Sequence, residues 1–209
     1  MSALERIAFF QNRRDEVPNL ELAKTLAETK DHQGIREIAE NLWSKDKNIQ
    51  SDCLKVLYEI GYTEPGLVAD YAGDFLKLLK NKNNRLVWGG MIALGTVAQL
   101  KADALFPRWE EVRDSMEAGS VITKDNGVKV LAAIAAQKEQ YSQAIFPYLL
   151  HHLKTCRPKE VPQHAEKILV AVNKANKSDF LHVLDERTPG LKPSEITRIQ
   201  RILRQLEKI

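Results

Sequence analysis

Apolar residues recur along most of the chain at spacings of three and four positions. The segment that contains Ile35, Ile38 and Leu42 shows this spacing clearly. Such spacing places the apolar side chains on one face of a helix and leaves the opposite face polar. No segment shows the sustained alternation of apolar and polar residues that is typical of a β-strand. The pattern therefore predicts an all-α protein.

Helix breakers and polar turns divide this pattern into twelve expected helices, which we pair into six antiparallel hairpins. Asp31, Ser178 and Ser194 are expected N-caps, because their side chains accept hydrogen bonds from free backbone N–H groups. Gly61 is expected to end a helix. The predicted helices span residues 2–13, 18–29, 32–43, 49–60, 67–79, 84–98, 105–116, 123–137, 141–153, 162–172, 178–186 and 195–206.

Two of these helical segments resemble one another at a fixed separation. Residues 84–98 are rich in small side chains, and residues 124–136 repeat that character. Each segment is followed by similar residues, Ala104-Leu-Phe-Pro107 and Ala144-Ile-Phe-Pro147, which lie 40 positions apart. Self-similarity at such a spacing is typical of helical repeat arrays.

The second helices of the expected pairs align with one another. Leu57, Met91, Leu131 and Leu169 then stack at steps of 34, 40 and 38 residues. Small residues in these helices allow their neighbours to approach closely. The resulting packing offsets the cost of about 1 kcal/mol for each glycine inside a helix.

The segment Ala93-Leu-Gly95 resembles the consensus of short bacterial HEAT repeats, which usually carry an arginine where Val87 stands. The resemblance extends over nearly the whole chain. It implies an α-α superhelix of HEAT-like or armadillo-type hairpins, with about five to six helix pairs, in a single domain over residues 1–209. It also implies a non-catalytic scaffold that binds a protein or peptide along the concave face formed by the second helices.

Composition places few further limits on function. The chain has 209 residues, of which 44% are apolar and 28% are charged, as expected of a globular protein. Its two cysteines, Cys53 and Cys156, are too few for a disulfide framework. There is no apolar run long enough for a membrane span or a signal peptide, so we expect a cytoplasmic protein. The formal net charge of +3 neither requires nor excludes a polyanionic partner.

A row of basic residues runs through the aligned second helices. Arg85 lies one turn before Gly89, and Trp88 lies near the same face, where it could anchor a peptide. On a concave face this row would engage an acidic protein segment or phosphates. Ordinary solvated helix faces are also charged, without any partner. The predicted partner-binding residues are Lys55, Arg85, Trp88, Lys129, Lys167 and Arg201.

Leu42-Trp43, followed by the expected helix over residues 49–60, resembles a segment of the HEAT-like alkylpurine DNA glycosylases. That family carries a Trp-Asp-x-Val-Asp segment in a later helix. The nearest equivalent here is Trp88-Gly-Gly-Met-Ile92, with an isoleucine in place of the second aspartate. Without that carboxylate, base excision loses its electrostatic support for the positive charge that develops on the sugar. The alternative to peptide binding is therefore nucleic-acid binding without glycosylase activity. A phycobilin-attaching lyase of the HEAT type is supported through the repeats alone.

A histidine-rich segment is the nearest approach to a metal site. His152 and Cys156 share a helix face, and His164 follows after a turn. Transition-metal sites need three or four ligands in fixed geometry, and the adjacent His151 and His152 point about 100° apart. Histidine near a helix C-terminus also has an ordinary explanation in the helix dipole. We therefore predict no metal site and no cofactor.

Ser178, His182 and Asp185 are the residue types of a hydrolase triad. They lie along one short helix, at positions i, i+4 and i+7. A catalytic serine needs presentation at a sharp turn beside an oxyanion hole, and this segment supplies neither. We predict that the chain has no catalytic residue.

Overall fold

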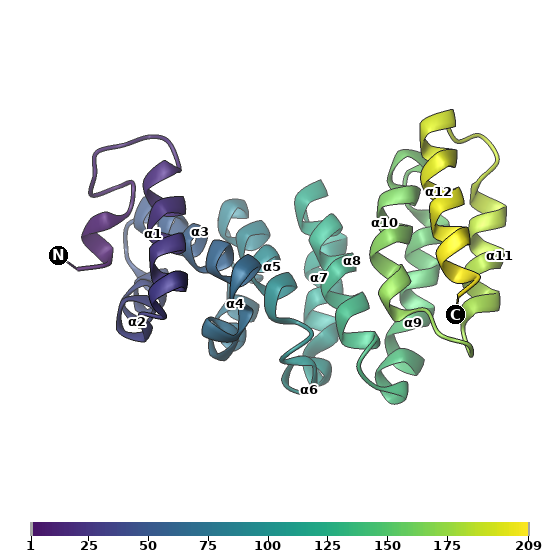
Figure 1. Ribbon diagram of the computed structural model, residues 1–209, viewed down its shortest axis with the longest axis horizontal. Coiled ribbons are helices and arrows are strands. Elements are labelled where there is room, and N and C mark those ends of the chain that lie inside the picture. The colour runs from purple at the N-terminus through teal and green to yellow at the C-terminus, as the bar shows by residue number, and fades with distance from the viewer. Residues whose placement is uncertain (1, 209) are drawn as a thin grey trace. The chain divides into compact units, whose positions relative to one another are not determined.

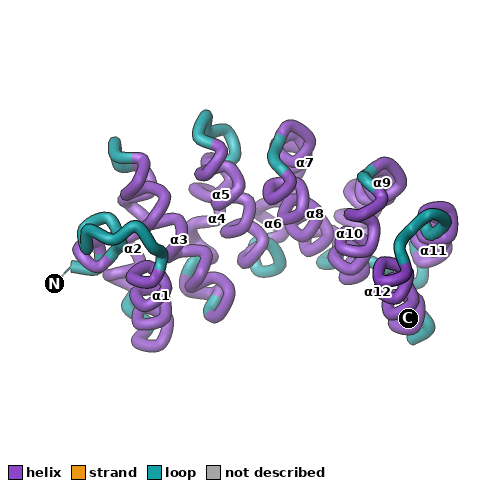
Figure 2. The backbone as a smooth tube through the Cα atoms, turned by 90° about the horizontal axis from the view of Figure 1, so that it is seen from above, coloured by secondary structure: helices purple, strands orange, loops and turns teal. Residues whose placement is uncertain are grey.

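The structure, a computed structural model, describes residues 2–208. Over this range the chain forms helices joined by loops and contains no strand (Figure 2). The all-α prediction is therefore confirmed. The chain divides into two compact units, Met1–Gly127 and Val128–Ile209. Within the described residues no helix is both long enough and apolar enough to cross a bilayer.

The helices follow one another in the order shown in Figure 1. The first unit contains α1 (Val17–Thr29), α2 (His32–Glu40), α3 (Lys47–Thr63), α4 (Ala72–Leu78), α5 (Asn84–Val97), α6 (Ala102–Leu105) and α7 (Trp109–Ala118). Helix α8 (Val121–Ala135) begins in the first unit and ends in the second. The second unit continues with α9 (Glu139–Thr155), α10 (Val161–Ile168), α11 (Lys177–Arg187) and α12 (Pro193–Leu206).

Short polar side chains start three of these helices. The carboxylate of Asp31 accepts a hydrogen bond from the backbone N–H of Gly34 at 2.9 Å, which confirms this predicted N-cap. Asp46 caps α3 and Asn83 caps α5 in the same way. Each cap satisfies a backbone donor that has no partner inside the helix.

The two predicted serine caps are wrong. Helix α11 begins after Asn176, so Ser178 lies inside its first turn. Helix α12 begins at Pro193, and its N-cap is Lys192 rather than Ser194. Proline suits the first position of a helix, because its fixed φ angle is already helical and its missing N–H needs no partner there.

Other predicted boundaries were also displaced. Residues 2–13 form only the 3₁₀ turn Leu4–Arg6, because side chains take their backbone donors. The N–H of Ala8 donates to Asn19, and that of Phe9 donates to Asp52, each at 2.9 Å. Gly61 does not end α3, which continues to Thr63.

Two first helices of the hairpins contain a proline, and only one of them is interrupted. Pro107 lies in a 3₁₀ turn that separates α6 from α7, where the sequence predicted one helix over residues 105–116. Pro147 lies inside α9, which nevertheless runs to Thr155. A proline removes one backbone donor from the helical ladder, so it favours local rearrangement. The region predicted as helix 67–79 likewise begins with 3₁₀ turns before α4.

In the first unit, the second helices of the hairpins pack side by side. Helix α3 lies between α1 and α5 and contacts both (Figure 1). Helix α2 packs on α3, and α4 packs on α5, so each hairpin closes on its own second helix. The apolar residues of α3 that this arrangement buries include Leu54, Val56, Leu57 and Ile60.

Two glycines fix how α3 lies against α5. A Cβ atom on Gly61 would lie 2.2 Å from Oγ1 of Thr96, and one on Gly89 would lie 2.6 Å from Cδ2 of Leu54. Both pairs join residues 35 positions apart, so the two helices run parallel in a constant register. The sequence alignment placed Leu57 opposite Met91 with a step of 34 residues, which agrees to within one residue.

In the second unit, α10 packs on α12 and α9 packs on α11. The rings of Phe146 and Phe180 join α9 to α11, with centroids 6.5 Å apart. The Arg198 guanidinium donates to the Glu166 carboxylate and joins α12 to α10. First helices therefore pack on first helices here, and second helices pack on second helices. The prediction of one domain over residues 1–209 stays a prediction.

Replacing Gly61 with alanine should lower the free energy of unfolding by about 1–3 kcal/mol. The new methyl group overlaps Oγ1 and Cβ of Thr96, a branched side chain that cannot move aside easily. Chemical denaturation measures the change. Gly66→Ala is the matched control, because no atom lies within 4 Å of its added Cβ. An equal effect of the two substitutions would contradict this account of the α3–α5 contact.

Candidate functional site

The exposed stripes of α1, α3 and α5 form one face of the first unit, which we call the second-helix face. Glu16, at the start of α1, shows that these stripes lie together. One of its carboxylate oxygens lies 3.0 Å from Nζ of Lys55 in α3. The other lies 3.4 Å from Nη2 of Arg85 in α5. The face comprises Glu16, Leu20, Lys24, Glu28, Lys55, Glu59, Tyr62, Arg85, Trp88 and Ile92.

Lys55 is the most enclosed cation of this face. Its side chain is 14% exposed, and its ammonium lies 2.8 Å from Glu59 and 5.0 Å from the ring centroid of Tyr58. Burial alone would lower the pKa of Lys55, but hydrogen bonds to Glu59 and Glu16 outweigh burial and raise this pKa above its usual range. Most of the charge of Lys55 therefore acts within the molecule.

Arg85 and Trp88 are the other two predicted contact residues in the first unit. They lie three positions apart in α5, so they share its exposed stripe, and Ile92 continues that stripe one turn later. The Arg85 side chain is 50% exposed even though it contacts Glu16. Trp88 and Ile92 are partly exposed. The stripe thus combines a guanidinium group, an aromatic ring and an aliphatic side chain.

A surface groove lies between α1 and α3. Its volume is ≈ 370 Å³, and its lining mixes apolar and acidic side chains. Leu20 is 41% exposed at this groove, although it is a large apolar residue. The lining residues are Leu20, Ala23, Lys24, Ala27, Glu28, Glu59, Thr63 and Glu64. The sequence alignment missed the groove, because it depends on which helices lie side by side.

Three of the predicted contact residues lie in the second unit. Lys129, in the last part of α8, is half-buried, and burial lowers the pKa of its ammonium group. Lys167 in α10 is also half-buried, whereas Arg201 in α12 is exposed. Their assignment to a binding surface stays a prediction.

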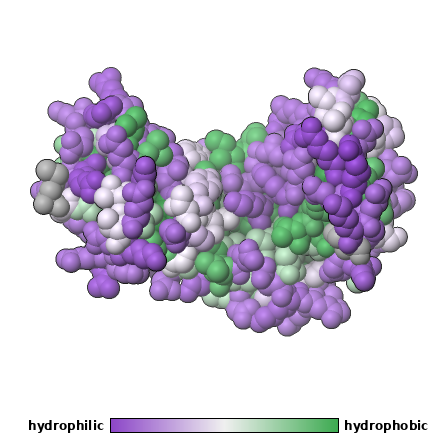
Figure 3. Space-filling model, in the orientation of Figure 1, coloured by the Kyte–Doolittle hydropathy of each residue, from purple (hydrophilic) through white to green (hydrophobic). Residues whose placement is uncertain are grey.

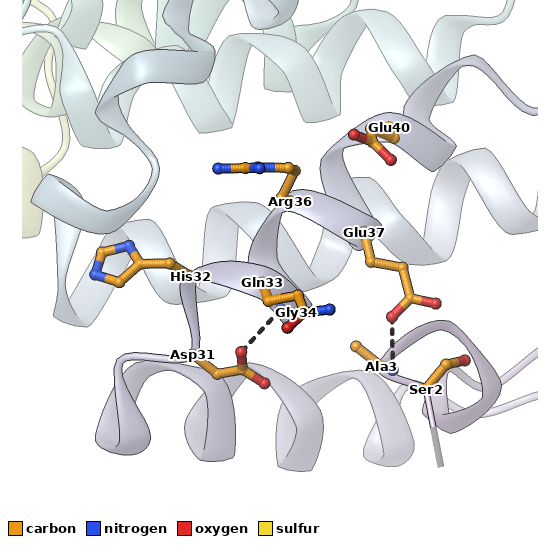
Figure 4. A pocket seen from close by; sticks show the side chains of 9 residues that line it. All are labelled: Ser2, Ala3, Asp31, His32, Gln33, Gly34, Arg36, Glu37 and Glu40. Atoms are coloured by element: carbon orange, nitrogen blue, oxygen red, sulfur yellow. Dashed lines mark hydrogen bonds between the residues drawn. The ribbon is translucent and has the colours of Figure 1, made fainter.

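A second hollow in the first unit is occupied by structural interactions. It has a volume of ≈ 870 Å³ and lies between the N-terminal residues and the start of α2 (Figure 4). Two of its carboxylates bind backbone N–H groups, Asp31 that of Gly34 and Glu37 that of Ala3. These two carboxylates stabilise the start of α2 and the N-terminal turn, so both have a structural role in this hollow.

The segment compared with the glycosylases carries no carboxylate at the corresponding position. Ile92 occupies that position on the exposed stripe of α5. Trp43 is 48% exposed, with Nζ of Lys77 5.9 Å from its ring centroid. Trp109 is partly exposed and lies against the guanidinium of Arg113.

The residues that resembled a hydrolase triad lie along α11 at its surface. Ser178, His182 and Asp185 are all exposed. The ring of His182 lies 3.3 Å from the carboxylate of Glu186. The geometry of a nucleophile held by a base is not assembled by this helix.

The structure brings His152, Cys156 and His164 together in the second unit. Nε2 of His152 lies 3.1 Å from Nδ1 of His164. His164 is fully buried, whereas Cys156 and His152 are partly buried and the adjacent His151 is exposed. Burial raises the pKa of the Cys156 thiol to about 11. The sequence placed His152 and Cys156 on one face but could not place His164 against them.

These stacked hairpins have the architecture of HEAT and armadillo repeats, so the chain has an α-solenoid fold. An engineered protein of known structure is similar over 100% of this chain and 98% of its own, with 17% identity and a TM-score of 0.69. No protein-family model and no curated protein sequence matches the chain.

Two further structures show the same fold. A designed armadillo repeat protein, solved in complex with the peptide (KR)4, is 12% identical over 89% of this chain and 86% of its own, with a TM-score of 0.70. The karyopherin Kap121p is 15% identical over 88% of this chain, with a TM-score of 0.63. This chain covers 21% of Kap121p, and another structure shows Kap121p bound to Ste12p. At these identities the similarity establishes the fold alone.

Replacing Lys55 with methionine should lower the free energy of unfolding by about 1–2 kcal/mol, because two carboxylates lose their shared cation. The loss is limited, since Glu16 and Glu59 are 44% and 25% exposed and regain water. The pKa of Lys55 is raised on folding, so its contribution is complete below the unfolded pKa and disappears only as pH rises through the raised value. Chemical denaturation at pH 7 therefore measures the full contribution of Lys55 to the free energy of unfolding.

Lys24→Met is the matched control for this measurement. Its ion pair with Glu28 spans 3.8 Å between side chains that are 75% and 64% exposed, so the effect should stay below about 0.5 kcal/mol. If Lys55→Met changed stability no more than Lys24→Met, the pairing of Lys55 would have no energetic importance.

Proposed function

We propose that this protein is a non-catalytic module that binds a protein or peptide segment along the second-helix face. The observation that carries the proposal is the parallel stacking of α1, α3 and α5, which places their exposed stripes on one continuous face of the first unit. Stacked repeats use such extended surfaces to bind partners. The solvent-exposed parts of the face provide the contacts.

The chemistry of the face favours a segment with an apolar residue between charges of opposite sign. Trp88 presents an aromatic surface, and the guanidinium of Arg85 can donate hydrogen bonds to an acidic side chain beside it. The groove between α1 and α3 receives an apolar side chain near Leu20, and Glu28 and Glu64 favour a basic residue there. The designed armadillo protein solved with (KR)4 shares this fold, which is consistent with a peptide ligand.

Nucleic acid is the less favoured partner. Neutralising phosphates requires cations that are free to release counterions. In the first unit, Glu16 contacts both Lys55 and Arg85, and Glu59 contacts Lys55 again. The carboxylates of Glu28 and Glu64 add negative charge to the adjoining groove. These groups weaken the attraction that a basic row would exert on a polyanion.

Peptides selected from a random displayed library against the full chain provide the probe. Trp88→Ala and Arg85→Glu should each weaken a selected peptide at least tenfold, about 1.4 kcal/mol, as measured by fluorescence anisotropy. Trp43→Ala is the matched control, because Trp43 is an exposed tryptophan outside the second-helix face and its removal should leave affinity unchanged. Unchanged affinity in both α5 variants would refute this face as the site.

The contribution of the second unit is tested with the same peptides. Lys129→Glu combined with Lys167→Glu should weaken binding of acidic peptides about tenfold or more, if these lysines contact the partner. Lys174→Glu, an exposed lysine that follows α10, serves as the control for net charge. Combining Lys174→Glu with Lys159→Glu, a second exposed lysine, matches the charge change of the double variant. Equal effects of the two double variants would remove Lys129 and Lys167 from the site.

Oligonucleotides distinguish the alternative. Single-stranded and duplex DNA should show only weak binding at physiological salt. Tight binding whose logarithm falls steeply with the logarithm of salt concentration would instead identify a nucleic-acid-binding protein.

A further inference from the structure

Three potential metal ligands converge at the turn between α9 and α10. One ring nitrogen of His152, one of His164 and the sulfur of Cys156 all lie within 4.8 Å of one another. The two histidine rings have centroids 4.9 Å apart and are tilted by 39°. Two imidazoles and a thiol are a common donor set for zinc and other borderline divalent metals.

The local fold explains why these groups meet. His152 and Cys156 are four positions apart at the C-terminal end of α9, so they lie on one side of the helix. The chain then turns through Pro158–Glu160 and enters α10, whose first turns bring His164 back against them. The turn is held by Arg157, whose guanidinium binds the carboxylate of Glu160. The three donors therefore come from two helices joined by a defined turn.

The spacing is close to what a tetrahedral ion requires. Metal–nitrogen bonds of about 2.0–2.1 Å and metal–sulfur bonds of about 2.3 Å separate two nitrogens by about 3.3 Å and a nitrogen from sulfur by about 3.6 Å. The two ring nitrogens lie 3.1 Å apart, and the widest separation in the set is 4.8 Å. Side-chain rotations that move the donor atoms by up to about one ångström would bring all three atoms onto one ion.

A second observation comes from Arg187 in α11. Its Nη2 donates to the backbone carbonyl of Cys156 at 2.5 Å, so its guanidinium lies beside the cysteine. Its Nε is buried and has no hydrogen-bond partner. Buried donors normally have partners, and an orphan donor calls for an explanation. A metal-bound thiolate, or an anion in an open coordination position, would be a stronger acceptor than the sulfur of a neutral thiol, which accepts only weakly.

An ordinary hydrogen bond between the two imidazoles explains part of this arrangement. It would satisfy one nitrogen of the buried His164. It does not involve the sulfur of Cys156, which donates a weak hydrogen bond to the backbone carbonyl of Leu153 at 3.4 Å, and it leaves the Nε of Arg187 without a partner. The complete set of donors thus extends beyond what a structural histidine pair needs.

We propose that His152, Cys156 and His164 bind one divalent transition-metal ion, with Zn²⁺ as the fitting ion and one coordination position left open. The ion links the end of α9 to α10 and stabilises the turn between them. This proposal revises the sequence-based expectation of no metal, and it does not depend on the proposed function, because all three ligands lie in the second unit and outside the second-helix face.

The test uses the full chain without a histidine tag, treated with a chelator and then titrated with Co²⁺ or Zn²⁺. We expect one Co²⁺ per chain, with the strong visible absorption of a tetrahedral site and a thiolate-to-cobalt charge-transfer band. Zn²⁺ should displace the Co²⁺ and raise the melting temperature, because it binds the folded state. No binding near one equivalent would overturn the proposal.

Variants assign the ligands. Cys156→Ser should abolish the charge-transfer band, and both Cys156→Ser and His152→Gln should weaken binding at least about tenfold. The matched controls are His151→Gln, an exposed neighbour, and Cys53→Ser, the other cysteine, and both should bind Co²⁺ as the unmodified chain does. Retained affinity in both ligand variants, or an equal loss in the controls, would refute the site. Circular dichroism confirms folding, and His152→Gln decides the test if Cys156→Ser does not fold.

Discussion

The architecture depends on how closely the backbone of α3 can approach α5. Gly61 and Gly89 carry no side chain at the points where Thr96 and Leu54 press against them. Two contacts with the same separation along the chain leave one parallel alignment of the helices, which fixes where every exposed residue of α3 and α5 lies. The second-helix face therefore results from packing on its reverse side. The order of its residues along the helices is set by the side chains that pack between α3 and α5.

Two positive charges on that face are paired by one residue that lies outside the aligned helices. Glu16 precedes α1 and reaches both Lys55 and Arg85, so a single carboxylate joins three elements. Two cations of the row seen in the sequence, Lys55 and Arg85, are thus held in ion pairs within the first unit. In the view of Figure 3, hydrophilic residues cover most of the surface, and smaller hydrophobic patches lie among them. Recognition of a partner would accordingly rest on mixed polarity more than on net charge.

Periodicity and capping chemistry were sufficient to predict the helical repeats, the Asp31 cap and the alignment of α3 with α5. These features depend on neighbours within a few residues or on a repeat unit. The prediction failed where distant groups compete for the backbone, as when Asn19 and Asp52 bind the donors of Ala8 and Phe9. The sequence also could not predict the groove beside Leu20 or the contact of His164 with His152, because both depend on which helix faces become neighbours.

The close fit at the glycines also constrains how this sequence can change over time. The space that Gly89 leaves open is filled by Leu54, and the space beside Gly61 is filled by Thr96. A larger residue at one member of a pair would be accommodated only by a smaller residue at the other. In homologous sequences, substitutions at positions 54 and 89, and at 61 and 96, should therefore be correlated, which would make the shared boundary of two repeats visible without any coordinates.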